Sequence, residues 1–256
     1  MTSALIGHTG FVGSTLARAK KYGALYNSKN IQALDGRTFD TVVCAGVSAA
    51  KWLANKDPEA DLREINRLIS HLEKVHAQRF VLISTIDVYR EPAAVDESAV
   101  PQREGLHAYG LHRLMLENYV RSRFDVAVVI RLPGLFGEGL RKNLIFDLLN
   151  RHQLANISPN SVLQWYAMRR FPQDLAAILQ SGIELINIAV EPVPTEAIRQ
   201  RMFPALEIGE TTLAGPQYDM QTQFAELLGG RGRYHMDAAA MMDELEQFVC
   251  AERGRA

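Results

Sequence analysis

The stretch Ala4-Leu5-Ile6-Gly7-His8-Thr9-Gly10-Phe11-Val12-Gly13-Ser14 decides the fold of this chain of 256 residues. An apolar run leads into glycines at positions 7, 10 and 13, and the helix-compatible segment 14–21 follows. This order of strand, glycine turn and helix is the arrangement that holds a dinucleotide pyrophosphate, because free N–H groups of the first helical turn face the anion. Three glycines can also form a plain loop, but between a strand and a helix we favour cofactor binding.

Each glycine has a separate task in such a turn. Gly7 takes the tight turn, Gly10 lets the backbone approach the phosphates, and Gly13 lets the helix lie close to the strand. The spacing is G-x-x-G-x-x-G rather than the G-x-G-x-x-G of ordinary dehydrogenases. The residues expected to contact the cofactor are Gly7, Thr9, Gly10, Phe11, Val12 and Gly13 in the turn, and Cys44, Ala45 and Gly46 at the end of a later strand.

Expected strands and helices alternate along the first half of the chain. The strands are residues 24–26, 40–46, 80–85 and 126–130, and the long helices are residues 58–76 and 106–123. Continuous apolar strands separated by helices indicate a parallel sheet that helices cover on both faces. We therefore expect a doubly wound α/β sheet, a Rossmann fold, with ligands at the carboxyl ends of the strands.

Composition narrows the class of protein. The chain is 47% hydrophobic and 22% charged, so it can form a sizeable core and shows no sign of disorder. Its net charge of −1, with both signs interspersed, gives no electrostatic case for binding nucleic acid or an anionic membrane. The two cysteines predict no disulfide framework and no metal site. With no leader and no membrane-spanning apolar run, we expect a cytoplasmic protein.

The end of the second expected strand bears on the identity of the cofactor. NAD-preferring sites carry an acidic residue about 20 positions past the glycines, which holds a ribose 2′-hydroxyl. Here the segment is Asn27-Ser28-Lys29, which contains no carboxylate to repel a 2′-phosphate. Ser28 and Lys29 could donate to that phosphate, so we expect NADP rather than NAD, although a polar turn with a solvated lysine would look the same. Asp35 is a candidate for the adenine amino group or for capping a turn.

Candidate catalytic side chains stand where a later strand ends and the next helix begins. Thr85 directly follows an apolar strand, and Tyr109 opens a helix that also carries Arg113. Tyr109 and Arg113 are four residues apart and share one helix face. A tyrosine beside a fixed cation has its phenolate favoured, which suits it to proton transfer at a carbonyl or hydroxyl. The pattern Tyr-x-x-x-Arg is common on helices, and taken alone it indicates a surface pair.

Five segments, in chain order, resemble the motifs of one family. They are the glycine turn at 7–13, the strand end Leu82–Tyr89 (similar to S-S-x-x-V-Y), the acidic-then-proline stretch 96–101, Tyr109–Glu117 (similar to Y-G-x-x-K-x-x-x-E), and Arg131–Gly137 (similar to R-x-x-x-x-Y-G). Over residues 1–190 the chain thereby resembles the extended short-chain dehydrogenase/reductases, the nucleotide-sugar epimerases, dehydratases and reductases.

The resemblance implies an NAD(P)-dependent reaction on a nucleotide-linked sugar. Tyr109 would be the acid/base, and Thr85 would orient the substrate oxygen. Ser84 and Pro133 would lie against the cofactor, and Asn143 would contact the substrate. A homodimer formed through the two long helices is also implied.

Arg113 departs from the family pattern, which has lysine at this position. In the family, the lysine binds the nicotinamide ribose and lowers the pKa of the tyrosine. Arginine keeps the charge, but it is planar and places its donors differently. The site could therefore turn over with altered efficiency, or bind a cofactor without turnover. Arg90, where the family has glycine, is a smaller departure.

The second half of the chain is less informative. Residues 140–152, 194–203 and 238–249 are expected helices, and 161–166 is an expected strand on which Gln164 and Tyr166 could line a substrate pocket or simply pack. We expect a cofactor domain at 1–135 and a small mixed α/β substrate part at 136–256, from which 160–190 returns to the first domain.

Three functions are consistent with these observations. The first is an oxidoreductase, epimerase or dehydratase acting on a nucleotide-linked sugar with Tyr109, Thr85 and Arg113. The second is a catalytically impaired NADP(H)-binding regulator or scaffold, which Arg113 and the short second half support. The third is a reductase of another small carbonyl compound.

Overall fold

A six-stranded sheet in the order β10-β6-β4-β3-β1-β2 forms the centre of this computed structural model, which describes residues 2–255. The strands are β1 (Ser3–Ile6), β2 (Ala24–Tyr26), β3 (Thr38–Cys44), β4 (His76–Thr85), β6 (Ala127–Leu132) and β10 (Leu185–Asn187). β1 pairs in parallel with both β2 and β3, and β3 pairs in parallel with β4. The chain moves outward from β1 to β2 and then crosses to β3 on the other side of β1. The predicted doubly wound parallel sheet is confirmed.

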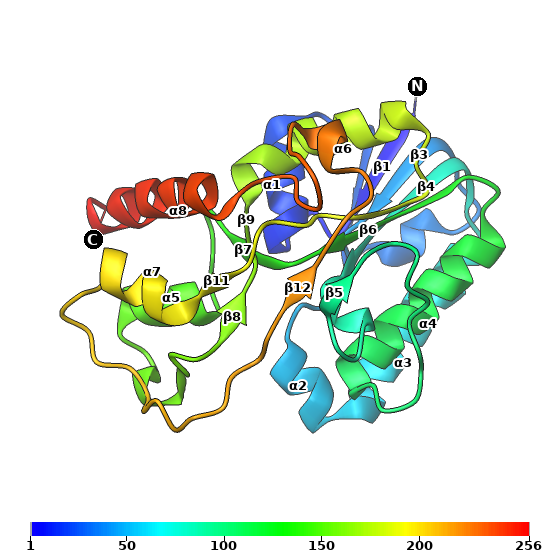
Figure 1. Ribbon diagram of the computed structural model, residues 1–256. Coiled ribbons are helices and arrows are strands. Elements are labelled where there is room, and N and C mark those ends of the chain that lie inside the picture. Colours follow the sequence, from blue (N-terminus) through cyan, green and yellow to red (C-terminus); the bar gives the residue numbers. More distant parts are fainter. Residues whose placement is uncertain (1, 256) are drawn as a thin grey trace. The chain divides into compact units, whose positions relative to one another are not determined.

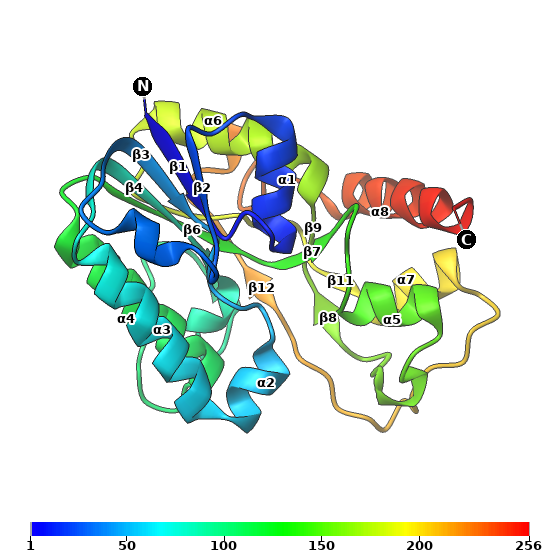
Figure 2. The ribbon, with the colours of Figure 1, turned by 180° about the vertical axis from the view of Figure 1, so that it is seen from behind.

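Helices cover both faces of this sheet. They are α1 (Phe11–Ala19), α3 (Pro58–Leu72), α4 (Ala108–Arg123) and α6 (Phe171–Ser181). Figure 1 shows α3 and α4 side by side over one face and α1 and α6 over the other, and Figure 2 shows the same layers from behind. Ile65, Leu68 and Leu72 form the buried stripe of α3, at the spacing of one face of a helix.

The ends of some elements differ from the predicted ones. The helix expected at 58–76 ends at Leu72, because His76 donates its N–H to the Arg37 carbonyl oxygen over 3.0 Å and so begins β4. The first helix begins at Phe11, three residues earlier than expected. The short elements that were not predicted include α2 (Lys51–Lys56) and the 3-10 turn η2 (Ile86–Val88). Their short, non-periodic sequences carry no helical signal.

The residues group into two units. The first, called the sheet unit, contains the residues up to Arg90 together with Ala99–Arg131 and Pro172–Ile186. The second unit contains Glu91–Ser98, Leu132–Phe171 and the residues from Asn187 on.

Three short strand pairs and three helices make up most of the second unit. The strands are β5 (Ala93–Val95), β7 (Gly134–Phe136), β8 (Val162–Leu163), β9 (Trp165–Ala167), β11 (Val193–Pro194) and β12 (Asp219–Met220), and the helices are α5 (Leu144–Asn150), α7 (Thr195–Met202) and α8 (Ala238–Arg253). The pairs are β7 with β9, β8 with β11, and β5 with β12. No helix within residues 2–255 combines the length and apolar composition needed to cross a bilayer.

A buried ion pair joins α4 to the sheet. Arg131, on β6, donates from Nη2 to Glu117 Oε2 over 2.6 Å and from Nη1 to the Tyr89 hydroxyl over 2.7 Å. Ser84 donates to the other Glu117 oxygen over 2.5 Å. Arg131 and Glu117 are 2% and 1% exposed, so neither charge has water to replace its partner.

We expect Glu117→Gln to lower the free energy of unfolding by about 3–5 kcal/mol, because it leaves the buried Arg131 charge without a counter-ion. Urea denaturation would measure the loss. The matched control is Glu64→Gln, at an exposed ion pair with Arg67, where a change below about 0.5 kcal/mol is expected. Equal losses at the two positions would contradict this account.

Candidate functional site

The glycine turn is held by two contacts that leave no room for side chains. Gly7 has φ +85°, a conformation that favours glycine, and a Cβ on it would lie 2.3 Å from the Ala45 carbonyl oxygen. A Cβ on Gly13 would lie 2.1 Å from the carbonyl oxygen of Gly7. Both positions therefore require glycine for packing within the protein itself.

Gly10 differs from the other two glycines of the turn. Its φ of −78° suits any residue, and a Cβ on it would meet Gly7 O at 3.4 Å and Ala45 O at 4.0 Å, which are ordinary contacts. The protein leaves space here, in front of the first N–H groups of α1, which have no acceptor within the helix. Such a space at a helix N-terminus fits a phosphate anion, and so a dinucleotide pyrophosphate.

The end of β3 lies beside this turn. Cys44 pairs with Ile6 in the parallel register, and Ala45 donates its N–H to the Ile6 carbonyl oxygen over 2.9 Å. Burial raises the pKa of the Cys44 thiol to about 11, so the side chain is an inert core group. The structure thus brings the turn and residues 44–46, both predicted from sequence, to the carboxyl ends of adjacent strands, at the crossover point of the sheet.

The segment after β2 is a turn closed by its own side chains. Asn27 accepts from the Lys29 N–H over 2.9 Å, and Asn30 accepts from the Asn27 N–H over 2.7 Å. Ser28 and Lys29 are exposed, which keeps both available to a ligand. Asp35 instead bonds His71 through one carboxylate oxygen at 2.6 Å and Lys74 through the other at 2.7 Å. Both oxygens are therefore engaged within the sheet unit.

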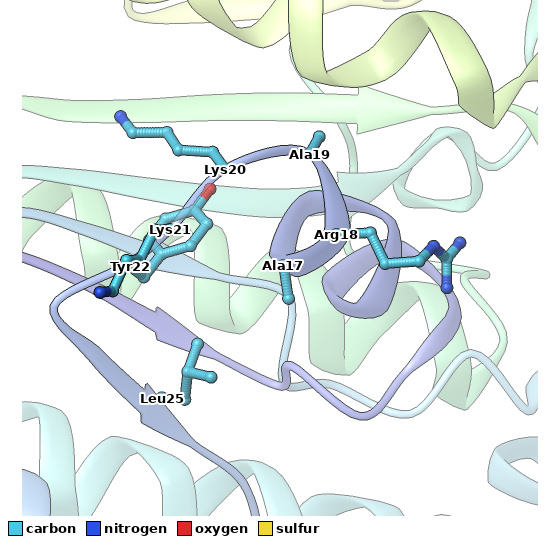
Figure 3. Close-up of a pocket in the computed structure, with 7 residues that line it drawn as sticks. All are labelled: Ala17, Arg18, Ala19, Lys20, Lys21, Tyr22 and Leu25. Carbon is cyan, nitrogen blue, oxygen red and sulfur yellow. The ribbon is translucent and has the colours of Figure 1, made fainter.

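A hollow in the sheet unit lies at the opposite end of α1. It is lined by Ala17, Arg18, Ala19, Lys20, Lys21, Tyr22 and Leu25 (Figure 3). The nine residues of α1 span roughly 13 Å, so this hollow is far from the glycine turn. Figure 3 shows Arg18 directed away from Lys20 and Lys21. None of the predicted cofactor residues lines it.

Tyr109 sits in the first turn of α4. It is 7% exposed, and its N–H donates to the side chain of Asn55, on α2, over 3.0 Å. Thr85, at the end of β4, lies close enough to this tyrosine to lower the pKa of its hydroxyl. The structure therefore joins the two side chains that the sequence proposed for one substrate oxygen. His107 caps the same helix, because its Nδ1 accepts from the Gly110 N–H over 3.1 Å.

Arg113 lies across the ring of Tyr109, with its Cζ 4.0 Å from the ring centroid. Its two terminal nitrogens donate to the carboxylate of Asp61, on α3, one of them over 2.9 Å, and one also donates to the Ser48 carbonyl oxygen over 2.7 Å. His112 contacts the same carboxylate at 2.7 Å. Arg113 is therefore engaged by the protein. Its buried Nε has no hydrogen-bond partner within residues 2–255 and is its remaining donor for a ligand.

These contacts change the expected electrostatics of Tyr109. Burial raises the pKa of its hydroxyl, the charge of Arg113 lowers it and that of Asp87 raises it, and the net pKa is above its usual value of 10.0. Burial also raises the pKa of Asp61, but hydrogen bonds from Arg113 and His112 outweigh it and hold the pKa below its ordinary range. The charge of Arg113 thus acts on Tyr109 in the expected direction, and burial outweighs it.

Sequence reasoning missed three charged side chains near the start of α4, which are Lys51, Asp61 and Asp87. Lys51 Nζ lies 2.7 Å from Asp87 Oδ1, and His107 Nε2 lies 3.9 Å from the same oxygen. No local signal marks these groups, because each is brought in by a different element of the sheet unit.

The remaining predicted residues have structural partners. Ser84 belongs to the buried network with Glu117, and Pro133 is buried in the second unit. Asn143 caps α5 by accepting from the Phe146 N–H over 3.1 Å, and it donates to the Leu135 carbonyl oxygen over 2.7 Å.

The expected strand at 161–166 divides into β8 and β9 at Gln164. The amide of Gln164 is 1% exposed and bonds Val190 O, Met220 O and Met220 N. Tyr166 is 2% exposed and packs edge-on against Phe171. The amide groups of Asn143 and Gln164 are thus engaged within the second unit, and Tyr166 is part of its core.

We expect Gly13→Ala to lower the free energy of unfolding by about 1–3 kcal/mol or more, because the added methyl group meets backbone that cannot move aside. Gly10→Ala, the matched variant three residues away, should change it by less than about 1 kcal/mol. Thermal or urea unfolding of both proteins would test this. Similar stability of the two variants would show that the glycine turn is not packed as described.

Comparison with known proteins finds likeness in structure only. No family model and no curated protein matches the chain. The solved structure of MoeE5 in complex with UDP-glucuronic acid and NAD matches over 100% of both chains, at 16% identity and a TM-score of 0.76.

Two further structures match to a similar degree. A dTDP-4-dehydrorhamnose reductase from Clostridium acetobutylicum matches over 99% of this chain and 100% of its own, at 13% identity and a TM-score of 0.75. The NAD-dependent NDP-hexosamine 5,6-dehydratase TunA matches over 100% and 99%, at 17% identity and a TM-score of 0.72. The chain therefore has the doubly wound α/β fold that these three structures share.

Proposed function

We propose that the chain is an extended short-chain dehydrogenase/reductase that uses a nicotinamide dinucleotide on a nucleotide-linked sugar. The observation that carries this proposal is the closeness of Thr85 to the Tyr109 hydroxyl, in the same unit as the space at Gly10. The names of the similar structures, two of which include NAD and all of which concern nucleotide-linked sugars or their reduction and dehydration, support the same class.

Residues of the sheet unit would hold the cofactor. The N–H groups of Phe11 and Val12, in front of Gly10, would face the pyrophosphate, and Gly46 would lie beside it. The Nε of Arg113 would donate to a ribose hydroxyl. When bound, the nicotinamide supplies the chemistry of accepting or returning a hydride.

Tyr109 and Thr85 would act on one substrate oxygen. Thr85 donates a hydrogen bond that orients a sugar hydroxyl, and the Tyr109 phenolate takes its proton as the carbon gives up a hydride. In the reverse direction Tyr109 returns the proton to the carbonyl oxygen. Because burial keeps the Tyr109 hydroxyl protonated at neutral pH, the geometry favours its role as an acid, which is the direction of carbonyl reduction.

A second function, dinucleotide binding without turnover, is favoured by one observation. Asp61 and the Ser48 carbonyl take both terminal nitrogens of Arg113, so this cation is less available to a ribose than a free ammonium would be. Tight cofactor binding together with no turnover on any of a panel of UDP- and dTDP-linked sugars would establish that alternative.

We expect Gly10→Ala to weaken NADH binding by at least about tenfold, because its methyl group occupies the space meant for a phosphate while the fold is kept. Titration of wild type and variant, followed by the fluorescence of the reduced nicotinamide, measures the effect. Equal affinity in the two proteins would remove the glycine turn from the proposed site.

The same titration with NADPH addresses the choice of cofactor. The Ser28 and Lys29 turn favours NADP, whereas the named cofactor of the similar structures is NAD, so we take NAD as the first candidate. Lys29→Glu should lower any affinity for NADPH and spare that for NADH. An unaltered ratio of the affinities for NADPH and NADH would show that Lys29 does not contact a 2′-phosphate.

We expect substrate oxidation to accelerate as the pH rises from 7 to 10, because the pKa of Tyr109 lies above its usual value and the phenolate fraction still grows over this range. Reduction should show the opposite trend. Tyr109→Phe should lower turnover by about 10²-fold or more in both directions while keeping NADH affinity. A flat pH profile, or a fully active Tyr109→Phe enzyme, would exclude Tyr109 as the acid/base.

A further inference from the structure

The ion pair of Lys51 and Asp87 is a feature of the sheet unit that the proposed reaction leaves unused. Lys51 Nζ lies 2.7 Å from Asp87 Oδ1, and the two side chains are 39% and 14% exposed. Asp87 lies in η2, directly after β4, and Lys51 is the first residue of α2. The short helix α2 therefore brings an ammonium group to the strand end that carries Thr85.

Asp87 is linked to the Tyr109 hydroxyl through Thr85. Its backbone N–H donates to Thr85 Oγ1 over 3.2 Å, and its Oδ2 lies 3.5 Å from the same hydroxyl. Asp87 also lies against the start of α4, because a Cβ on Gly110 would be 2.1 Å from its carbonyl oxygen. Its charge opposes the loss of a proton from Tyr109, because two negative charges would then lie together in a site of low polarity.

Other charged groups also lie around Tyr109. Arg113 is the nearest cation and lowers the pKa of Tyr109, and it is paired with the carboxylate of Asp61, which His112 also contacts. His107 lies 3.9 Å from Asp87, and burial together with the charge of Lys51 lowers its pKa, so it is neutral at pH 7. Lys51 is the cation that the structure pairs directly with Asp87.

We propose that Lys51 is a positioning residue for proton transfer at Tyr109, since its ammonium group neutralises Asp87 and so allows the phenolate to form. This inference rests on the proposed role of Tyr109. The charged groups around this tyrosine then form two ion pairs, Arg113 with Asp61 and Lys51 with Asp87. The opposite effects of Lys51 and Asp87 on the pKa of Tyr109 agree with this arrangement.

The test follows the titration of Tyr109 itself, without cofactor or substrate. Protein labelled with ¹³C at the tyrosine Cζ would be titrated by NMR from pH 7 to 11, with Tyr109→Phe identifying the signal. Lys51→Met should move the Tyr109 curve to higher pH, and Asp87→Asn should move it to lower pH. The double variant Lys51→Met/Asp87→Asn should return it close to the wild-type curve, because neither charge is left.

The double variant separates this proposal from a purely structural role. If the ion pair only tethers α2, the double variant loses the tether and keeps the curve of Lys51→Met, which would overturn the proposal. So would a Lys51→Met curve that superimposes on the wild-type curve. Lys56→Met, on the same helix, is the control and should change nothing.

Turnover gives an independent readout. At pH 8, Lys51→Met should lower the rate of substrate oxidation by roughly tenfold with little change in KM, and Lys51→Arg should restore much of it. Raising the pH should also recover the rate, whereas a structural defect would persist at every pH. Failure of NADH to bind would reject the proposed function and leave the Tyr109 titrations as a separate result.

Discussion

The close approach of Gly13 to the carbonyl group of Gly7 is the constraint on which the sheet unit is built. With no side chain at position 13, the first turn of α1 lies directly on the end of β1, and Gly7 lies as closely on Ala45 at the end of β3. Strand, helix and neighbouring strand thus form one rigid corner. Gly10, at the middle of that corner, is not required by any such contact, so packing within the protein does not explain its lack of a side chain.

The candidate site shows how burial alters the meaning of a charged side chain. Arg113 is stacked on Tyr109, which is the geometry that would favour a phenolate, yet Asp61 balances its charge and holds its terminal donors. A cation close to a tyrosine is thus insufficient when burial raises the pKa of the hydroxyl by more than the cation lowers it. The charges at the hydroxyl come from Arg113 on the same helix and from Lys51 and Asp87 on α2 and η2.

The predictable parts of this molecule are those whose signal is local. The glycine turn, the apolar strands and the stripe of α3 each follow from residues within a few positions of one another, and the structure confirms them. The closeness of Tyr109 and Thr85 was suggested through family resemblance, because 24 positions of sequence separate the two. The pairing of Arg113 with Asp61 spans 52 positions and carries no periodic signal, so the sequence could not indicate it. The first residues of β4 were assigned to the end of the preceding helix. Exposed and half-buried residues alternate there, and no residue clearly signals the end of the helix.

The cap of α4 has a consequence for the acidity range in which the site keeps its shape. His107 holds the first helical turn, and with it Tyr109, because its Nδ1 accepts a hydrogen bond from the Gly110 N–H. Nδ1 can accept only while it carries no proton, so the imidazole must stay neutral. Burial and the charge of Lys51 lower the pKa of His107, which preserves the cap below the ordinary histidine value of about 6.5. In more acid solution the second proton removes the acceptor, and the helix start loses about 1 kcal/mol of capping. His107 and Tyr109, separated by one position in the chain, are therefore the two groups of this site whose titration changes it, the first in acid and the second in alkaline solution.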